Sequence, residues 1–252
     1  MNAHRLLIVC CLFSLALPLH SFACPVENGS GQASLPDGSV YKGEFAACLF
    51  EGHGELDWPD GSSYVGSFHH GLRDGQGRLT TAKWVYDGDF HEGRQSGHGE
   101  MSFANGDRYR GEFQDGQFNG SGLYVSASGE TYQGQFKEGL YDGTGALIQD
   151  DGARIVGEFR DGLCNGTAVA VYANGDHYEG QFRDGYWDGN GVLVYADGDS
   201  YVGQFQQGVF NGLGRYTSPE DGEVLEGEWK NGEFLDPDNS AKPLAGQTPV
   251  AI

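Results

Sequence analysis

The sequence predicts an all-β protein: an elongated single-layer antiparallel β-meander built of about nine β-hairpin repeats of 23 residues. Three observations predict this class. A five-residue pattern recurs nine times, 40 of the 43 glycines fall at fixed places in the copies, and aromatic residues alternate with polar ones. Aromatic residues make up 13% of the 252 residues, more than a disordered acidic chain carries, so we expect the chain to fold.

The repeat array covers residues 41–234, and its copies start 22 to 24 residues apart. The copy Tyr178-Glu179-Gly180-Gln181-Phe182 shows the pattern, with the tyrosine as position 1 of the repeat. Alternate side chains of a strand point to opposite faces, so the Tyr, Gly and Phe of each copy share one face. The aromatic residues expected in the common core are Tyr64, Phe68, Tyr109, Phe113, Tyr132, Phe136, Tyr178, Phe182, Tyr201 and Phe205.

Each repeat is predicted to be one hairpin, with a first turn centred on positions 8 to 12. An Asp-Gly or Asn-Gly pair, as at Asn174-Gly175, follows near the end of the repeat, and such pairs strongly favour a β-hairpin turn. Glycine inside a strand lowers stability by about 0.5–1 kcal/mol relative to alanine. Regular glycines at positions 3 and 14 therefore need a compensating cause, and we expect aromatic rings to lie across the backbone there. A single hairpin is marginal in water, whereas a stack of hairpins is stable as an array.

Residues 1–23 are predicted to be a signal peptide. Arg5 precedes a 12-residue apolar run, and Ser21-Phe22-Ala23 offers small residues at a cleavage site. We therefore expect an exported protein, periplasmic or secreted. Cys24 follows that site directly, which leaves a lipoprotein attached through Cys24 as the alternative.

The charge of the chain excludes some partners. The net charge is −21, and it becomes −22 when residues 1–23, with one basic residue and no acid, are removed. Such a chain repels the phosphates of nucleic acid and the anionic face of a bilayer, so no nucleic-acid partner is expected.

Three cysteines lie beyond the signal peptide. Cys48 and Cys164 are five repeats apart, roughly 50 Å by strand spacing, so they should not pair. Cys24 and Cys48 form the feasible disulfide in an exported chain, and it would pin residues 24–40 as an N-terminal cap over the first hairpin. Cys164 would then be a lone thiol.

The clearest variation between repeats lies at positions 10 and 11, in the expected first loop. Five of the eight loops have an aromatic residue at position 10, and several have an acid or Asn beside it. Two interpretations remain open: the rings pack on adjacent loops, or they form a ladder that grips an extended peptide or a glycan. The candidate binding residues are Phe50, Phe118, Tyr141, Asp142, Trp187, Asp188 and Phe210.

Catalysis, cofactors and metals are not expected. The Asp-Gly-Asp and Asn-Gly-Asp triplets could suggest calcium, but Ca²⁺ needs six to eight converging oxygens, and no calcium-loop pattern is present. His53 and His98 should lie roughly 20 Å apart by strand spacing and cannot share a metal. No nucleophile, metalloprotease or phosphate-loop motif is present.

The repeat pattern, Y-x-G-x-F-x-x-G-x-x-x-G-x-G followed by an apolar pair and D/N-G, resembles the MORN repeat family. The stretch Tyr178 to Gly185 is close to that family's usual YEGEFxNG opening, and nine copies in register make the resemblance specific. The resemblance implies a β-meander that binds or scaffolds other molecules. The family's association with membranes fits poorly with a charge of −22.

The function expected from these features is an exported non-enzymatic scaffold for protein–protein interaction or assembly. The alternative is an envelope or surface module that binds a glycan or a lipid. Residues 235–252 lack the repeat pattern and are expected to be a C-terminal tail.

Overall fold

The computed structural model describes residues 26–236 and 241–243, and its regular structure there is antiparallel β-sheet without a helix. The prediction of an all-β chain of hairpin repeats is therefore confirmed for this part of the chain. The fold divides into two compact units. Unit 1 contains residues up to 127 together with 136–139, and unit 2 contains residues 128–135 and those from 140 onward.

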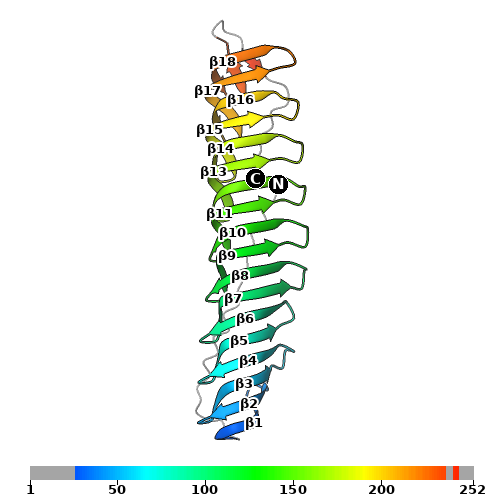
Figure 1. The fold of residues 1–252 in the computed structure, drawn as a ribbon, viewed down its shortest axis with the longest axis vertical. Helices are drawn as coiled ribbons and strands as arrows, with labels where there is room; N and C mark the ends of the chain where they lie inside the picture. The colour runs from blue at the N-terminus through cyan, green and yellow to red at the C-terminus, as the bar shows by residue number, and fades with distance from the viewer. Residues whose placement is uncertain (1–25, 237–240, 244–252) are drawn as a thin grey trace. The chain divides into compact units, whose positions relative to one another are not determined.

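Within each unit, strands that follow one another in the chain pair antiparallel (Figure 1). The strands of unit 1 are β1 (Asn28–Ser34), β2 (Val40–Ala46), β3 (Leu49–Asp57), β4 (Ser63–His69), β5 (Leu72–Thr80), β6 (Trp84–His91), β7 (Arg94–Phe103), β8 (Arg108–Gln114) and β9 (Gln117–Val125). β10 (Thr131–Lys137) has residues in both units. The strands of unit 2 are β11 (Leu140–Ile148), β12 (Arg154–Arg160), β13 (Leu163–Val171), β14 (His177–Arg183), β15 (Tyr186–Val194), β16 (Ser200–Gln206), β17 (Val209–Ser218), β18 (Glu223–Lys230), β19 (Glu233–Leu235) and β20 (Ala241–Pro243).

The first turn of each repeat is a two-residue turn at positions 7 and 8. In the hairpin of β14 and β15, Arg183 pairs with Tyr186, and the two residues between them have φ of 51° at Asp184 and 83° at Gly185. Positive φ at both central residues defines the type I′ turn, whose twist matches that of the flanking strands. The residue at position 7 has a φ of 47° to 51° in eight further repeats: Ala47, His70, Glu92, Asp115, Glu138, Asp161, Gln207 and Asn231.

The prediction that this turn is centred on positions 8 to 12 is wrong. Position 12, as at Gly189 with φ 108°, lies in a β-bulge, where the pairing register shifts between Gly180 and Phe182. Glycine takes a positive φ both in the turn at position 8 and in the bulge at position 12. The two glycines look alike in the sequence, which is why the sequence predicts a turn that extends over both. Positions 10 and 11 consequently lie in the second strand of the hairpin and not in a loop.

The second turn forms as the sequence predicts at Asp60-Gly61, Asn105-Gly106, Asp151-Gly152, Asn174-Gly175 and Asp197-Gly198. At Asp197-Gly198, the backbone N–H of Gly198 donates to the carbonyl of Tyr195 at 3.0 Å, and the backbone N–H of Tyr195 donates to the carbonyl of Asp199 at 2.8 Å. The side chain of Asp197 accepts a further bond from the Asp199 amide at 3.1 Å. Gly198 has φ 98°, the left-handed conformation that makes glycine the favoured residue at the end of this hairpin loop.

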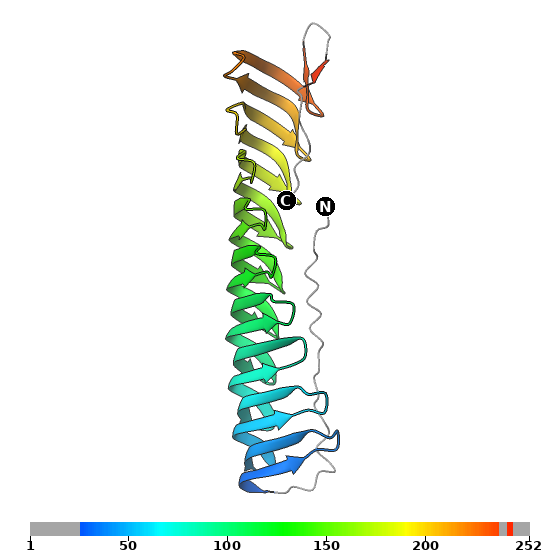
Figure 2. The ribbon, with the colours of Figure 1, turned by 90° about the vertical axis from the view of Figure 1, so that its right-hand side faces the viewer.

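The core is a layer of rings on one face of the sheet, which we call the inner face. Tyr178 lies across the facing glycines 180 and 191, and its hydroxyl donates to the carbonyl of Gln181 at 3.0 Å. The edges of Phe182 and of Phe205 in the next repeat meet this ring at 5.1 and 5.2 Å between centroids. The ten aromatic residues expected in the core are all buried, with exposed fractions of 0 to 4%. The strands of the sheet are curved and not flat (Figure 2).

Cys48 stands at position 8 of the first repeat and is disulfide-bonded. The other cysteine among the described residues, Cys164, is free, so the partner of Cys48 lies outside those residues. Cys24 lies there too, and its pairing with Cys48 stays a prediction.

Candidate functional site

The five candidate rings at position 10 lie on the inner face as members of the core. Each ring stacks on the tyrosine at position 1 of its own repeat, with centroids 3.6 to 4.7 Å apart. The pairs are Tyr41 with Phe50, Tyr109 with Phe118, Tyr132 with Tyr141, Tyr178 with Trp187, and Tyr201 with Phe210. Phe118, Trp187 and Phe210 are buried, whereas Phe50 and Tyr141 are half-buried. These contacts favour the packing interpretation over a ladder of rings free to hold a ligand.

Trp187 shows how completely such a ring is enclosed. One face stacks on Tyr178, and the indole meets Tyr172 and Phe205 at 5.7 Å in edge contacts. Its Nε1 donates a hydrogen bond to the hydroxyl of Tyr172 at 2.7 Å. The polar atom that a ligand would have to address is therefore already bonded within the protein.

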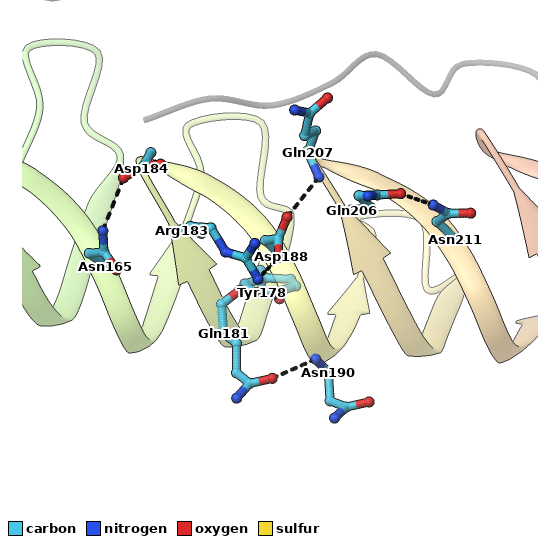
Figure 3. Close-up of polar contacts among 10 residues, drawn as sticks. All are labelled: Asn165, Tyr178, Gln181, Arg183, Asp184, Asp188, Asn190, Gln206, Gln207 and Asn211. Atoms are coloured by element: carbon cyan, nitrogen blue, oxygen red, sulfur yellow. Dashed lines mark hydrogen bonds and ion pairs between the residues drawn. The ribbon is translucent and has the colours of Figure 1, made fainter.

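Asp188 holds neighbouring repeats together (Figure 3). Its carboxylate lies 2.7 Å from the guanidinium of Arg183. It also accepts a hydrogen bond at 3.4 Å from the backbone N–H of Gln207, in the first turn of the next repeat. The side chain of Asp188 is only 12% exposed. A related contact in Figure 3 joins Asn165, also at position 11, to Asp184 in the next turn at 3.2 Å. In these two repeats the residue at position 11 ties its repeat to the next turn.

The same tie occurs in unit 1 at Glu51. Its carboxylate accepts from the amide of His70 at 2.9 Å and lies 2.8 Å from Nδ1 of His69. The hydrogen bonds from these two histidines hold the pKa of Glu51 below its ordinary value. The inter-repeat contact at position 11 therefore belongs to the fold in both units.

We expect Asp188→Ala to lower the free energy of unfolding by about 1–2 kcal/mol, because it leaves the Gln207 amide and the Arg183 guanidinium without their acceptor. Asp142→Ala is the control, since Asp142 occupies the same position but makes no hydrogen bond or ion pair with any described residue. Its change should stay within about 0.5 kcal/mol. Urea denaturation measures both, and equal losses would contradict the role of Asp188.

In the second repeat, Arg73 takes the place of the stacked ring. Its guanidinium lies over the rings of Trp58, Tyr64 and Phe90, at 5.9, 5.7 and 5.3 Å from their centroids. It donates to the carbonyl of Gly93 in the next repeat at 2.6 Å. A planar cation can lie over ring faces as an aromatic side chain does, so the arginine continues the layer of rings.

Replacing Arg73 by Ala should lower the free energy of unfolding by about 2–3 kcal/mol, because both the ring contacts and a charge-assisted hydrogen bond disappear. Arg73→Lys should recover less than half of this loss, since an ammonium has no plane to lie over the rings. Arg78 of the same strand has a 61% exposed side chain and pairs with Asp87. Arg78→Ala should therefore cost less than about 1 kcal/mol. Thermal unfolding of the three variants measures these costs, and an equal cost for Arg78→Ala and Arg73→Ala would refute the assignment.

Sequence reasoning missed a second set of rings on the inner face, at position 18 near the end of each second strand. These rings are half-buried: Trp58 and Phe103 in unit 1, and Tyr172 and Tyr195 in unit 2. The signal was available, because position 18 has the same parity as the buried position 16 and is aromatic in four of eight repeats. We call them the inner-face rings.

Within residues 26–236 and 241–243, no group of three or more His, Cys, Asp and Glu could hold a metal ion. Burial raises the pKa of the Cys164 thiol to about 12, so this thiol is protonated at neutral pH. No helix in this part of the chain has the length and apolarity needed to span a membrane.

The fold and the site define a class of protein: a chain of β-hairpin repeats whose rings form a core layer in each unit. The model of the MORN repeat matches nine segments: 41–63, 64–84, 86–108, 109–131, 132–154, 156–177, 178–200, 201–222 and 226–234. The chain belongs to the MORN repeat family. None of the curated proteins compared with the chain matches it significantly.

Among solved structures, the chain is similar to the TCP10 domain of Danio rerio CPAP, with 15% identity and a TM-score of 0.39, over 79% of this chain and 100% of that one. It is also similar to the SAS-4 (dCPAP) TCP domain of Drosophila melanogaster, solved in complex with a proline-rich motif of Ana2. That similarity has 12% identity and a TM-score of 0.38, over 75% of this chain and 96% of that one.

Proposed function

We propose that this MORN repeat protein is an exported, non-enzymatic scaffold that binds an extended segment of another protein along its inner face. The observation that carries the proposal is the set of inner-face rings. They are half-buried and rest on a core of stacked rings, such as the enclosed Trp187, so they present apolar area on a rigid support. Aromatic rings held in this way lose little conformational freedom on binding, which favours them at interfaces.

Export is part of the proposal. It rests on the signal peptide predicted at residues 1–23 and on the disulfide of Cys48, because disulfides form and persist in oxidising compartments. Expressing the full chain and fractionating the cells tests this part, and an intact residue 1–23 segment in cytosolic protein would contradict it. Mass spectrometry of the fractionated protein shows whether residues 1–23 are removed and whether Cys24 carries a lipid.

The absence of catalysis is proposed from the state of the reactive groups. The core tyrosines are committed to hydrogen bonds, as Tyr201 is to the carbonyl of Gln204 at 3.1 Å. The buried Cys164 thiol is held neutral. Neither kind of group is placed to act as a nucleophile on a bound substrate.

The experiment uses mature protein and a displayed library of random peptides. We expect the wild type to enrich a family of sequences, and the double variant Tyr172→Ala/Tyr195→Ala to lose at least tenfold in affinity for them. Tyr186→Ala is the control, because Tyr186 lies in the same unit with 39% exposure but faces away from the inner face. Equal binding by both variants would exclude the inner-face rings.

The same two variants, tested on an array of glycans and on lipid vesicles, decide the alternative of an envelope module for glycan or lipid. Binding there that depends on Tyr172 and Tyr195, without peptide enrichment, would replace the protein partner by that ligand.

A further inference from the structure

In unit 1, polar side chains replace the stacked ring of the core in two adjacent repeats. Arg73 occupies position 10 of the second repeat, and Gln95 occupies the same position of the third. Strand pairing places Arg73 beside Phe68 and Gln95 beside Phe90, the register in which position 10 carries a stacked ring in other hairpins. Both side chains therefore lie on the inner face, and both residues are half-buried.

The hydrogen-bonding groups of these side chains are only partly used. Arg73 donates through Nη2 to the carbonyl of Gly93, while its Nε and Nη1 have no acceptor among the residues that the structure describes. The side-chain amide of Gln95 makes no hydrogen bond to any of those residues either. The same holds for the indole N–H of Trp58, which lies beside Arg73, whereas the indole N–H of Trp187 is bonded within the protein.

The Arg73 cation also lacks a counter-ion, because its guanidinium forms no ion pair within residues 26–236 and 241–243. The neighbouring Asp74 is engaged elsewhere: it lies 3.2 Å from Nδ1 of His91 and accepts a hydrogen bond from the backbone N–H of Glu92 at 3.1 Å. Burial removes water from the guanidinium and lowers the pKa of Arg73 from its ordinary value. A half-buried cation of this kind gains from an added carboxylate.

We propose that Arg73, with the ring of Trp58 beside it, binds a carboxylate of the partner segment on the inner face. A carboxylate matches the planar fork of a guanidinium with two parallel hydrogen bonds. Gln95 lies one repeat further, roughly 10 Å along the sheet, and its amide both donates and accepts, which suits a backbone peptide group of the same segment. Arg73 thereby fixes the position of the segment. This last assignment rests on the proposed function, whereas carboxylate binding itself does not.

The charge of the chain limits what carries the carboxylate. A net charge of −21 repels a strongly acidic segment, so the favoured occupant has a single carboxylate in an otherwise neutral or basic sequence. An Asp or Glu side chain and the C-terminus of the partner present the same group to Arg73. The other lysines and arginines whose exposure the structure describes are exposed, so a carboxylate at them would meet water and not rings.

The test uses mature protein and small probes, so it needs no partner protein. N-acetylphenylalanine offers a terminal carboxylate, its amide is the neutral match, and the α-amide of N-acetylphenylalanylglutamate offers a side-chain carboxylate. NMR follows the Nε–H signal of Arg73 and the indole N–H signal of Trp58. We expect both acids to bind about fivefold or more tighter than the amide, and to weaken as salt is raised. The tighter acid identifies the source of the carboxylate.

Two probe results would overturn the proposal. One is equal affinity for N-acetylphenylalanine and its amide, which would leave only contact between rings. The other is phenyl phosphate binding more tightly than either acid, which would make the site a phosphate site.

Arg73→Phe is the decisive variant, because it removes the charge and supplies the ring that Phe118 places at this position. We expect it to stay folded, with the circular dichroism spectrum of the wild type, and to bind both acids no better than the amide. Arg73→Lys keeps the charge without the fork and should lose about threefold. Arg78→Ala removes an exposed arginine of the same strand and should change nothing. Unchanged binding of the acids by folded Arg73→Phe would overturn the proposal.

The carboxylate site and the proposed function fail separately. Tyr172→Ala/Tyr195→Ala lies in unit 2 and should leave probe binding unchanged. If the acids bind at Arg73 but no peptide is enriched from the displayed library, the carboxylate site stands and the proposed function fails. If enriched peptides bind Arg73→Phe as tightly as wild type, Arg73 does not position the segment and the proposed function stands.

Discussion

Gly191→Ala is expected to lower the free energy of unfolding by about 3 kcal/mol or more, because no side chain fits between the strand and the ring of Tyr178. A Cβ on Gly191 would lie 2.6 Å from Cζ of that ring. The ring cannot retreat, since Trp187 stacks on it at 4.7 Å and its hydroxyl is bonded to Gln181. Thermal unfolding followed by circular dichroism measures the loss.

Gly198→Ala separates lack of space from backbone strain. Gly198 has a φ of 98°, which disfavours alanine, but a Cβ there would meet no atom within 4 Å. We expect this variant to cost about 1 kcal/mol. If Gly198→Ala costs as much as Gly191→Ala, the close contact with the Tyr178 ring would not explain the size of the loss at Gly191.

Trp187→Ala is expected to cost about 3–5 kcal/mol, the range for removing a buried aromatic side chain and leaving a cavity. The substitution removes the stack on Tyr178, the edge contacts with Tyr172 and Phe205, and the bond from Nε1 to the Tyr172 hydroxyl. Chemical denaturation of wild type and variant gives the difference.

The controls for Trp187 lie at the same position and beside it. Trp187→Phe should cost only about 1–2 kcal/mol, because Phe210 shows that a phenylalanine stacks on the position-1 tyrosine, at 3.6 Å. Tyr186→Ala removes a 39% exposed neighbour and should cost less than about 1 kcal/mol. A Trp187→Ala protein that unfolds like wild type but no longer binds peptide would restore this ring as a ligand contact.

Much of the fold could be predicted from the sequence, because each rule involved is local. Strand parity predicts that Tyr178 and Phe182 share a face, and the Asp197-Gly198 pair predicts the closing turn. The first turn could not be placed correctly, since residues as different as His70, Glu92 and Gln207 take the left-handed conformation before glycine. The register of the whole hairpin imposes that conformation on them.

The candidate site was less predictable than the fold. Sequence reasoning placed Trp187 and Asp188 on an exposed loop, but a bulge at Gly189 puts them in a strand. Strand parity in the sequence was enough to place the half-buried rings at position 18 on the same face as the buried residue at position 16. Which of them stay uncovered depends on contacts between neighbouring repeats, which the pattern of one repeat does not contain.

The sequence by itself determined the repeat, the hairpins, the two faces and the residues of the ring core, because these follow from alternation along a strand and from the chemistry of glycine. Only the tertiary structure decided which aromatic residues are enclosed and which stay accessible. The reason is physical: a ring at position 10 is buried by a tyrosine nine residues earlier and by a phenylalanine of the next repeat. Burial is therefore a property of packed neighbours and not of the residue type.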